Sequence, residues 1–295
     1  MTIWFFLALS SAISNSLVQA FFNYFVSLKR VSKTTAVFWY SLIASIILFA
    51  VSYILGIPLL KSGFWTAILA TSAINAFTGP VLLRAYELGE FSSVYSMVLL
   101  TPVFSLLISA VWLGEIPGMY GVLGVLLTVL GLYIISKNND GADGNYADFK
   151  KGNSLGVLVA LLWAVTTIFD KQATLRSDPI FAPAVGLILI AFTNGAYSLF
   201  KPSSHVGENA GGRQSQFWTA GMFLLIPLGM LFALSNVLHN AALAQGFVAY
   251  TLAIKRTGIL LGVFWGWLFF KEKHLRRKLF GAVVAVSGVA AILLA

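Results

Sequence analysis

The sequence predicts an all-α integral membrane protein with ten transmembrane helices in two inverted five-helix repeats, and three observations predict it. Of the 295 residues, 59% are hydrophobic and only 10% are charged, whereas a soluble domain is about 45 to 50% apolar and about a quarter charged. The apolar residues form continuous runs of about 20, the length with which a helix crosses a bilayer, and not the alternating segments of about ten that a membrane barrel shows. The third observation is a pattern that the two halves share.

The apolar runs, broken by charges or by Gly and Pro, predict the helices in order. The first run has no Lys or Arg before it and no small-residue cleavage site, so we expect a retained span rather than a signal peptide. The predicted spans are residues 2–27, 34–55, 63–84, 91–113, 117–136, 153–173, 179–200, 217–244, 247–270 and 275–295. The segments between them are too short and polar for a soluble catalytic domain, so we expect the function to lie within the bundle.

The second half repeats the pattern of the first at an offset of 157 residues. The matched pairs are Ala85 and Ala242, Gly89 and Gly246, Glu115 and Glu272, Gly124 and Gly281, and Gly131 and Gly288. Five spans in each half make the second copy enter the membrane from the opposite side. We therefore divide the chain into a first repeat (1–136), a polar linker (137–152) and a second repeat (153–295). Many secondary transporters have inverted repeats, with the substrate site near the midplane between them; the alternative is a duplication that serves fold stability alone.

Short motifs accompany this plan in both halves. They are the Ala85-Tyr86-Glu87-Leu88 opening and its Ala242-Leu243 counterpart, the Thr101-Pro102-Val103-Phe104 step, the Gly114-Glu115 ending and the paired glycines of the fifth and tenth spans. Over nearly the whole chain this set resembles EamA-type transporters of the drug/metabolite transporter superfamily. The second half departs from the pattern, with Ile259 in place of the usual proline and Lys271 in place of glycine. The resemblance implies a carrier of small metabolites, often an exporter of amino acids or similar solutes, that uses proton or solute coupling and no ATP.

Basic residues are distributed unevenly between the loops. The odd-numbered loops carry 14 Lys and Arg residues and the even-numbered loops carry three, Lys61, Lys171 and Arg176. Positive loops stay in the cytoplasm, so we expect both termini outside, in a bacterial-type plasma (inner) membrane, although the resemblance implies termini inside. The net charge of +9 is then explained by topology, and no nucleic-acid partner is expected.

Polar side chains inside a span are costly unless they meet a partner or a cavity. On the first span they recur every four residues and share one face, and the third span has a further pair. These residues are Ser11, Asn15, Gln19 and Asn23, and Asn75 and Thr78. We expect Asn15, Gln19 and Asn75 to line a substrate cavity; hydrogen bonding between helices is the alternative.

The ninth span contains two cations, Lys255 and Arg256, about nine residues or roughly 13 Å from its start. At least one should face an aqueous cavity, unless the span begins near Thr257 and the pair is interfacial. In a cavity they would bind a carboxylate or phosphate of a substrate, or pair with an internal acid. The nearest acid, Asp170, either fills that role and permits proton coupling, or is neutralised by Lys171.

The eighth span places Asn236, His239 and Asn240 on one face. Imidazole titrates near neutral pH, so His239 either relays a proton or is simply hydrogen-bonded. Trp163 and Tyr250 are candidates to stack on a substrate, although packing against lipid is the commoner role of such rings.

Pro102 should kink the fourth span and help to gate the cavity, because proline removes a backbone hydrogen bond. Glu115 and Glu272 close the fourth and ninth spans, where each can interact with the positive end of the next helix. The glycines that the two repeats share, Gly124 and Gly131 in the first, should allow close helix packing.

The leading prediction is a secondary transporter of a small anionic or zwitterionic, amino-acid-like solute, acting as an exporter by alternating access. With ten acids and no acid cluster within a span, an enzyme is not expected. No cysteine and three scattered histidines predict no metal or other cofactor, and no Walker motif indicates ATP drive. The alternative is a lipid-linked phosphate flippase, or a flippase subunit, with a lateral opening between helices. Expected partners are a small-molecule substrate, membrane lipids and, as an option, a second copy of the chain.

Overall fold

The computed structural model describes residues 2–27, 33–88, 91–136, 146–200, 225–258, 260–261 and 275–295. The helices are α1 (Thr2–Ser27), α2 (Lys33–Leu55), α3 (Phe64–Leu88), α4 (Phe91–Val98), α5 (Thr101–Trp112), α6 (Met119–Ser136), α7 (Tyr146–Leu175), α8 (Phe181–Phe200), α9 (Leu225–Gln245), α10 (Val248–Arg256) and α12 (Leu275–Leu293). Within these ranges there is no strand, which confirms the all-α class.

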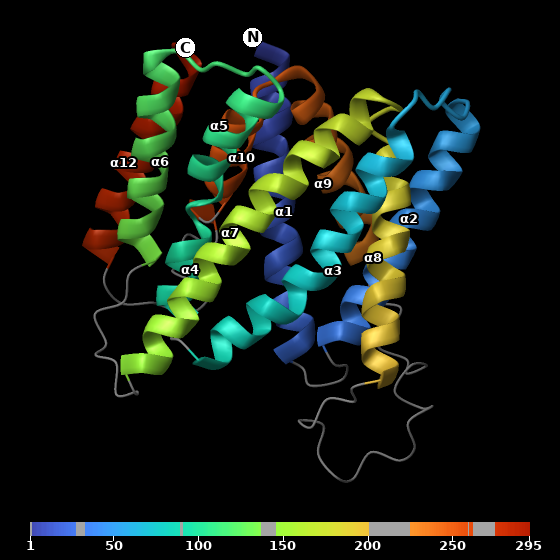
Figure 1. The fold of residues 1–295 in the computed structure, drawn as a ribbon, viewed down its shortest axis with the longest axis horizontal. Coiled ribbons are helices and arrows are strands. Elements are labelled where there is room, and N and C mark those ends of the chain that lie inside the picture. The colour runs from blue at the N-terminus through green and yellow to red at the C-terminus, as the bar shows by residue number, and fades with distance from the viewer. Residues whose placement is uncertain are drawn as a thin grey trace.

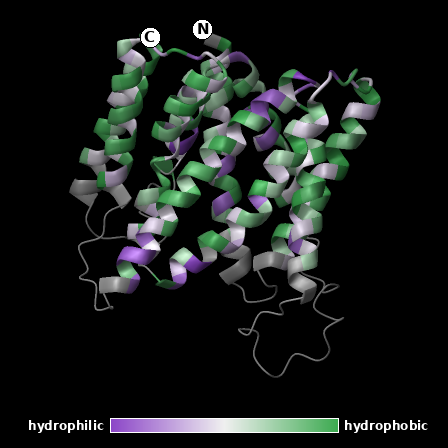
Figure 2. Ribbon diagram, in the orientation of Figure 1, coloured by the Kyte–Doolittle hydropathy of each residue, from purple (hydrophilic) through white to green (hydrophobic). Residues whose placement is uncertain are grey.

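Membrane-spanning length is clearest in α1, α2, α3, α7 and α9, which by length and composition could each cross a bilayer. Shorter apolar helices lie within α5, α6, α8 and α12. Figure 2 shows hydrophobic residues along most of the helical surface, with hydrophilic residues mainly at helix ends and at a few turns inside the bundle. The chain is therefore a multi-helix membrane protein.

Several predicted spans differ from the helices observed. Helix α3 extends to Leu88, beyond the predicted end at residue 84, and α10 ends at Arg256, within the predicted span 247–270. The seventh helix, α7, begins at Tyr146 rather than at residue 153, because the polar turns that contain Lys150 and Lys151 continue the helix beyond its apolar run. The predicted fourth span is broken into α4 and α5 at Leu99 and Leu100. Parts of the predicted spans 217–244 and 247–270, with Ile259, Lys271 and Glu272, and the side chain of Asn23, lie outside the described residues.

The two repeats have opposite directions in the bundle. In Figure 1, α1 runs away from the end that holds both termini, whereas α7, the first helix of the second repeat, runs toward that end. The same reversal relates α6 to α12. These directions agree with the inverted repeat that the odd number of spans predicts.

Equivalent residues of the two repeats meet where α6 packs against α12. A Cβ atom at Gly124 would lie 2.6 Å from the carbonyl oxygen of Gly288, so only glycine fits there. The hydroxyl of Thr128 approaches the carbonyl oxygen of Ala285 at 3.5 Å, and these two residues are separated by the repeat offset of 157. Gly124 faces Gly288 and not its own equivalent, Gly281, because the helices run antiparallel about a pseudo-two-fold axis near Thr128. The expected close packing at the shared glycines is confirmed.

Helix α7 holds a central place in the arrangement. It contacts α3, α4 and α5 of the first repeat and α8, α9 and α10 of the second, and it crosses the middle of the bundle in Figure 1. A side chain on α7 can therefore face either repeat, depending on its position around the helix. This placement brings its polar residues to the boundary between the repeats.

Candidate functional site

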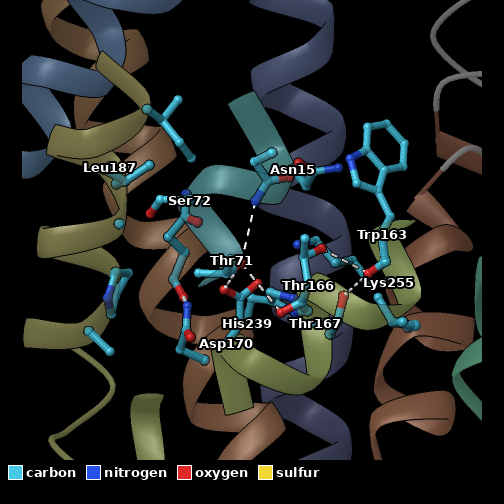
Figure 3. Close-up of a pocket in the computed structure, with 18 of the residues that line it drawn as sticks. Asn15, Thr71, Ser72, Trp163, Thr166, Thr167, Asp170, Leu187, His239 and Lys255 are labelled. Carbon is cyan, nitrogen blue, oxygen red and sulfur yellow. Dashed lines mark hydrogen bonds between the residues drawn. The ribbon is translucent and has the colours of Figure 1, made fainter. Parts of the chain in front are cut away.

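A cavity of about 300 Å³ lies in the bundle, lined by α1, α3 and α5 of the first repeat and by α7 to α10 of the second. The predicted site residues that line it are Asn15, Gln19, Asn75, Trp163, Asp170, Asn236, His239, Asn240, Lys255 and Arg256. Side chains from helices far apart in the sequence thus meet in one chamber, part of which is drawn in Figure 3. Their role in substrate binding stays a prediction.

The acid of the cavity, Asp170, is bonded to a hydroxyl and not to a cation. Its Oδ1 atom accepts a hydrogen bond of 2.8 Å from the hydroxyl of Thr71 on α3, and Figure 3 shows the two residues side by side. The amide of Asn75 donates in turn to the Thr71 hydroxyl at 3.4 Å. The carboxylate is therefore oriented by α3 while its charge remains unpaired by any described residue.

The neighbouring Lys171 faces another way and pairs with Glu115. Its ammonium also donates to the carbonyl oxygen of Gly246 at 2.6 Å, and the second carboxylate oxygen of Glu115 accepts from the backbone N–H of Val248 at 2.8 Å. Of the two alternatives for Asp170, neutralisation by Lys171 is therefore wrong. Consecutive residues of a helix point about 100° apart, so one faces the cavity and the other the α9–α10 turn.

Glu115 interacts with a helix N-terminus, as predicted, but the helix is different. Val248 is the first residue of α10, whose free N–H groups and partial positive charge favour a carboxylate. The sequence predicts this role for the following helix, α6, and the structure assigns it to α10. Gly114, with a positive φ of 68°, turns the chain at the end of α5, and the Glu115 side chain reaches across to the second repeat.

The two cations lie in the last turn of α10, and both line the cavity. The C-terminal end of a helix carries partial negative charge, which favours cations there. The guanidinium carbon of Arg256 lies 5.4 Å from the centroid of the Trp163 ring, a cation–π contact. Lys255 and Asp170 line the same cavity, yet they form no ion pair.

The polar face of α9 is partly used within the bundle. The amide of Asn240 accepts from the Thr174 hydroxyl at 2.7 Å and donates to the carbonyl oxygen of Asn236 at 2.9 Å. His239 lies between them in sequence and is buried, with no hydrogen-bond partner at Nδ1 among the described residues. The amide of Asn236 donates to the carbonyl oxygen of Phe232 at 2.8 Å, so both amides form hydrogen bonds within the bundle, while His239 lines the cavity with its Nδ1 atom buried.

Tyr250 does not line the cavity. Its ring packs against Trp4 and Phe247, with centroid distances of 6.4 and 5.1 Å, and a Cβ atom at Gly121 would collide with it. The reason is helical phase, since Lys255 follows Tyr250 by five residues and so lies about 140° around α10 from it. A stacking role for Tyr250 in the cavity is therefore not supported.

Pro102 also lies outside the cavity lining, which its neighbour Thr101 joins. It is a buried residue in the first turn of α5, directly after the break that separates α4 from α5. Proline is tolerated in a first helical turn because no intrahelical partner is lost there. The expected interruption of the fourth span is thus a break between two helices, and the role of Pro102 in gating stays a prediction.

Comparison with known protein families identifies the family to which this chain belongs. The EamA-like transporter family matches residues 2–137 and again residues 150–294. The chain belongs to the EamA-like transporter family. This EamA-like chain also resembles a solved structure titled "Crystal structure of protein", with a TM-score of 0.73 and 17% identity over 99% of this chain and 97% of the other. That likeness shows a shared fold, and no curated protein sequence matches significantly.

Membership in the EamA-like family identifies a membrane transporter of the drug/metabolite superfamily, in agreement with the resemblance seen in the sequence. Family members are transporters and not enzymes, which agrees with the expected absence of an enzymatic centre.

Sequence reasoning missed several hydroxyl-bearing residues that line the cavity of this EamA-like transporter. They are Thr71, Ser72, Thr101, Thr166 and Thr167. A hydroxyl in a helix can bond to the carbonyl of its own preceding turn, as Thr167 does to Trp163 at 2.8 Å. A hydroxyl that is bonded within its own helix needs no further partner in the membrane, so its presence in a span does not indicate a cavity. Only the arrangement of the helices shows that these residues face the cavity.

Proposed function

We propose that this EamA-like transporter carries a small zwitterionic or anionic, amino-acid-like solute through the cavity. The observation that carries the proposal is the arrangement of charge. Asp170 on α7 and Lys255 and Arg256 on α10 line one chamber, and none of them is ion-paired with another. A solute with a carboxylate and an ammonium would supply a partner for both kinds of group.

Energetic reasoning supports a ligand with its own charges. A charge removed from bulk water is costly unless it is paired and hydrogen-bonded. Hydrogen bonds in which donor or acceptor is ionised are roughly twice as strong as neutral ones. Such bonds would form between a substrate carboxylate and Lys255 and Arg256, and between a substrate ammonium and Asp170. The two cations could also bind a solute that carries only negative charge.

The mechanism that we propose is alternating access, in which the repeats rock about the cavity. Inverted repeats with a site between them are the arrangement that many secondary transporters use, and here both repeats contribute to the lining. Pro102, beside the α4–α5 break, would help the gate, and Asp170 or His239 would carry a coupled proton. We propose export as the direction in the cell.

A thermal-shift screen of the purified protein tests the substrate class. The panel contains amino acids, organic acids, nucleotide sugars, quaternary amines and polyprenyl phosphates, with Lys255→Ala beside the unaltered protein. A ligand at 100 times its Kd stabilises the folded state by about 2.7 kcal/mol. We expect zwitterionic or anionic solutes to raise Tm in the unaltered protein and not in Lys255→Ala.

Lys61→Ala is the matched control, because Lys61 is exposed and does not line the cavity; it should respond like the unaltered protein. Equal shifts in Lys255→Ala would remove this cation from the site. A shift by polyprenyl phosphates alone would overturn the solute proposal in favour of a flippase.

We also infer that the protein lies in a bacterial-type plasma membrane with both termini outside the cytoplasm. The support is the excess of basic residues in the odd-numbered loops, together with termini that lie at one end of the bundle (Figure 1). A C-terminal fusion to a reporter that fluoresces only in the cytoplasm should be dark. A bright fusion would contradict this orientation.

A further inference from the structure

One wall of the cavity, formed by α8, has no polar side chain. The residues of α8 that line the chamber are Ala182, Pro183, Gly186, Leu187 and Ile190. Their spacing of three and four residues places them on one face of the helix. This face offers a substrate apolar contact and, at Gly186, a position without a side chain.

The apolar wall lies across the chamber from the cations. In Figure 3, Leu187 lies at one side of the view and Trp163 and Lys255 at the other, with Thr71 and His239 between them. The cavity therefore presents three zones in order, which are cationic groups, then the acid with its hydroxyl partner Thr71, then an apolar surface. The carboxylate, the ammonium and the side chain of an α-amino acid branch from one carbon in different directions, so a single molecule can direct each group toward one of these three zones.

We propose that the cavity selects zwitterionic amino acids with an apolar side chain, and that Gly186 limits the bulk of that side chain. This inference rests on the proposed function and assigns the substrate an orientation. The carboxylate faces Lys255 and Arg256, the ammonium faces Asp170, and the side chain lies against α8. An acidic or strongly polar side chain would leave its hydrogen-bonding groups unpaired at this wall, which disfavours its binding.

The surroundings of Gly186 make it the position to vary. A Cβ atom there would lie 3.5 Å from the Cδ1 atom of Ile68, an ordinary van der Waals contact, so alanine fits without displacement of a neighbour. A leucine would extend into the chamber and occupy space that a substrate side chain needs. One methylene in an apolar pocket changes discrimination by about 10-fold or more, so the size preference should respond strongly.

The experiment measures Kd for alanine, valine, leucine and phenylalanine, with aspartate as the polar comparison. The proteins are the unaltered chain, Gly186→Ala, Gly186→Leu and the control Gly79→Leu. Gly79 does not line the cavity, and a Cβ atom there would meet nothing within 4 Å. We expect the unaltered protein and the control to bind leucine more tightly than alanine and to bind aspartate weakest.

In Gly186→Leu, the ratio of the Kd for leucine to the Kd for alanine should rise by about 10-fold or more, and Gly186→Ala should change it in the same direction by less. If Gly186→Leu fails to fold, Gly186→Ala decides alone. Unchanged ratios in both variants would overturn this inference; if Lys255→Ala still abolished binding, the proposed function would stand. Failure of the unaltered protein to bind any of these amino acids would overturn this inference, and the proposed function would fall with it if the thermal-shift panel also contains no zwitterionic or anionic ligand.

Discussion

Removal of the Glu115 carboxylate should destabilise the protein more than any loss of a surface charge. The substitution Glu115→Ala takes away two interactions together. It leaves the ammonium of Lys171 with the carbonyl of Gly246 as its remaining partner, and it leaves the N–H of Val248 at the start of α10 without its acceptor.

The magnitude follows from burial. The side chains of Lys171 and Glu115 are 11% and 8% exposed, and removal of one partner from a buried pair costs about 3 to 5 kcal/mol. The Gly246 carbonyl still accepts from Lys171, so we expect a value near the lower end, about 3 kcal/mol. The double substitution Glu115→Ala with Lys171→Met should recover part of this loss, because no buried charge is then left without its counterion.

The assay is thermal unfolding of the purified protein in one detergent. Glu87→Ala is the matched control, since Glu87 pairs with Arg84 at the surface, where the side chains are 63% and 60% exposed. Exposed pairs contribute about 0.2 to 1 kcal/mol, so its Tm should change little. A Tm for Glu115→Ala as high as that of Glu87→Ala, or a double variant no more stable than the single one, would refute the reasoning.

Three further predictions concern the cavity, the repeat axis and the gate. Thr71→Val removes the hydroxyl that donates to Asp170. A hydrogen bond to a charged group contributes about 1.5 to 3 kcal/mol, so the Kd for a zwitterionic solute, measured by titration, should rise roughly 10-fold or more. An unchanged Kd would contradict the role of this pair. Gly124→Leu should abolish monodisperse protein in size-exclusion chromatography, because its Cβ atom would lie 2.6 Å from the Gly288 carbonyl oxygen; normal yield and elution would contradict the close crossing. Pro102→Ala should slow transport while substrate binding is retained, and unchanged kinetics would count against a gating role.

Most of the fold could be predicted from the sequence because each helix that crosses a bilayer can be recognised from its own stretch of residues. Every span needs its own apolar run, and the repeat follows from matched glycines such as Gly124 and Gly281. The interruption between α4 and α5 was predicted only in part. Pro102 predicts a disturbed fourth span, but the helix is broken at Leu99 and Leu100, which are apolar like the rest of the run, so composition does not show a full break there.

The sequence predicts the site residues whose charged or strongly polar side chains are costly within a span, and it does not predict most of the other residues of the site. Asp170 and Lys255 stood out because an ionised group inside a span needs a cavity or a partner. The partner of Lys171 depends on a contact with Glu115, 56 residues away in sequence, which no local pattern contains. The α8 wall around Gly186 could not be recognised, because an apolar cavity wall has the same composition as a surface that faces lipid.

The central claim, that the cavity carries a zwitterionic solute between its acid and its cations, is tested most directly by counterflow in proteoliposomes. Vesicles with the purified protein are preloaded with an unlabelled amino acid, and uptake of the labelled one is measured. We predict exchange with the unaltered protein and with the control Lys61→Gln, and its loss in both Lys255→Gln and Asp170→Asn. Exchange that continues at the same rate in the two cavity variants, or no exchange of any zwitterion by the unaltered protein, would contradict the account.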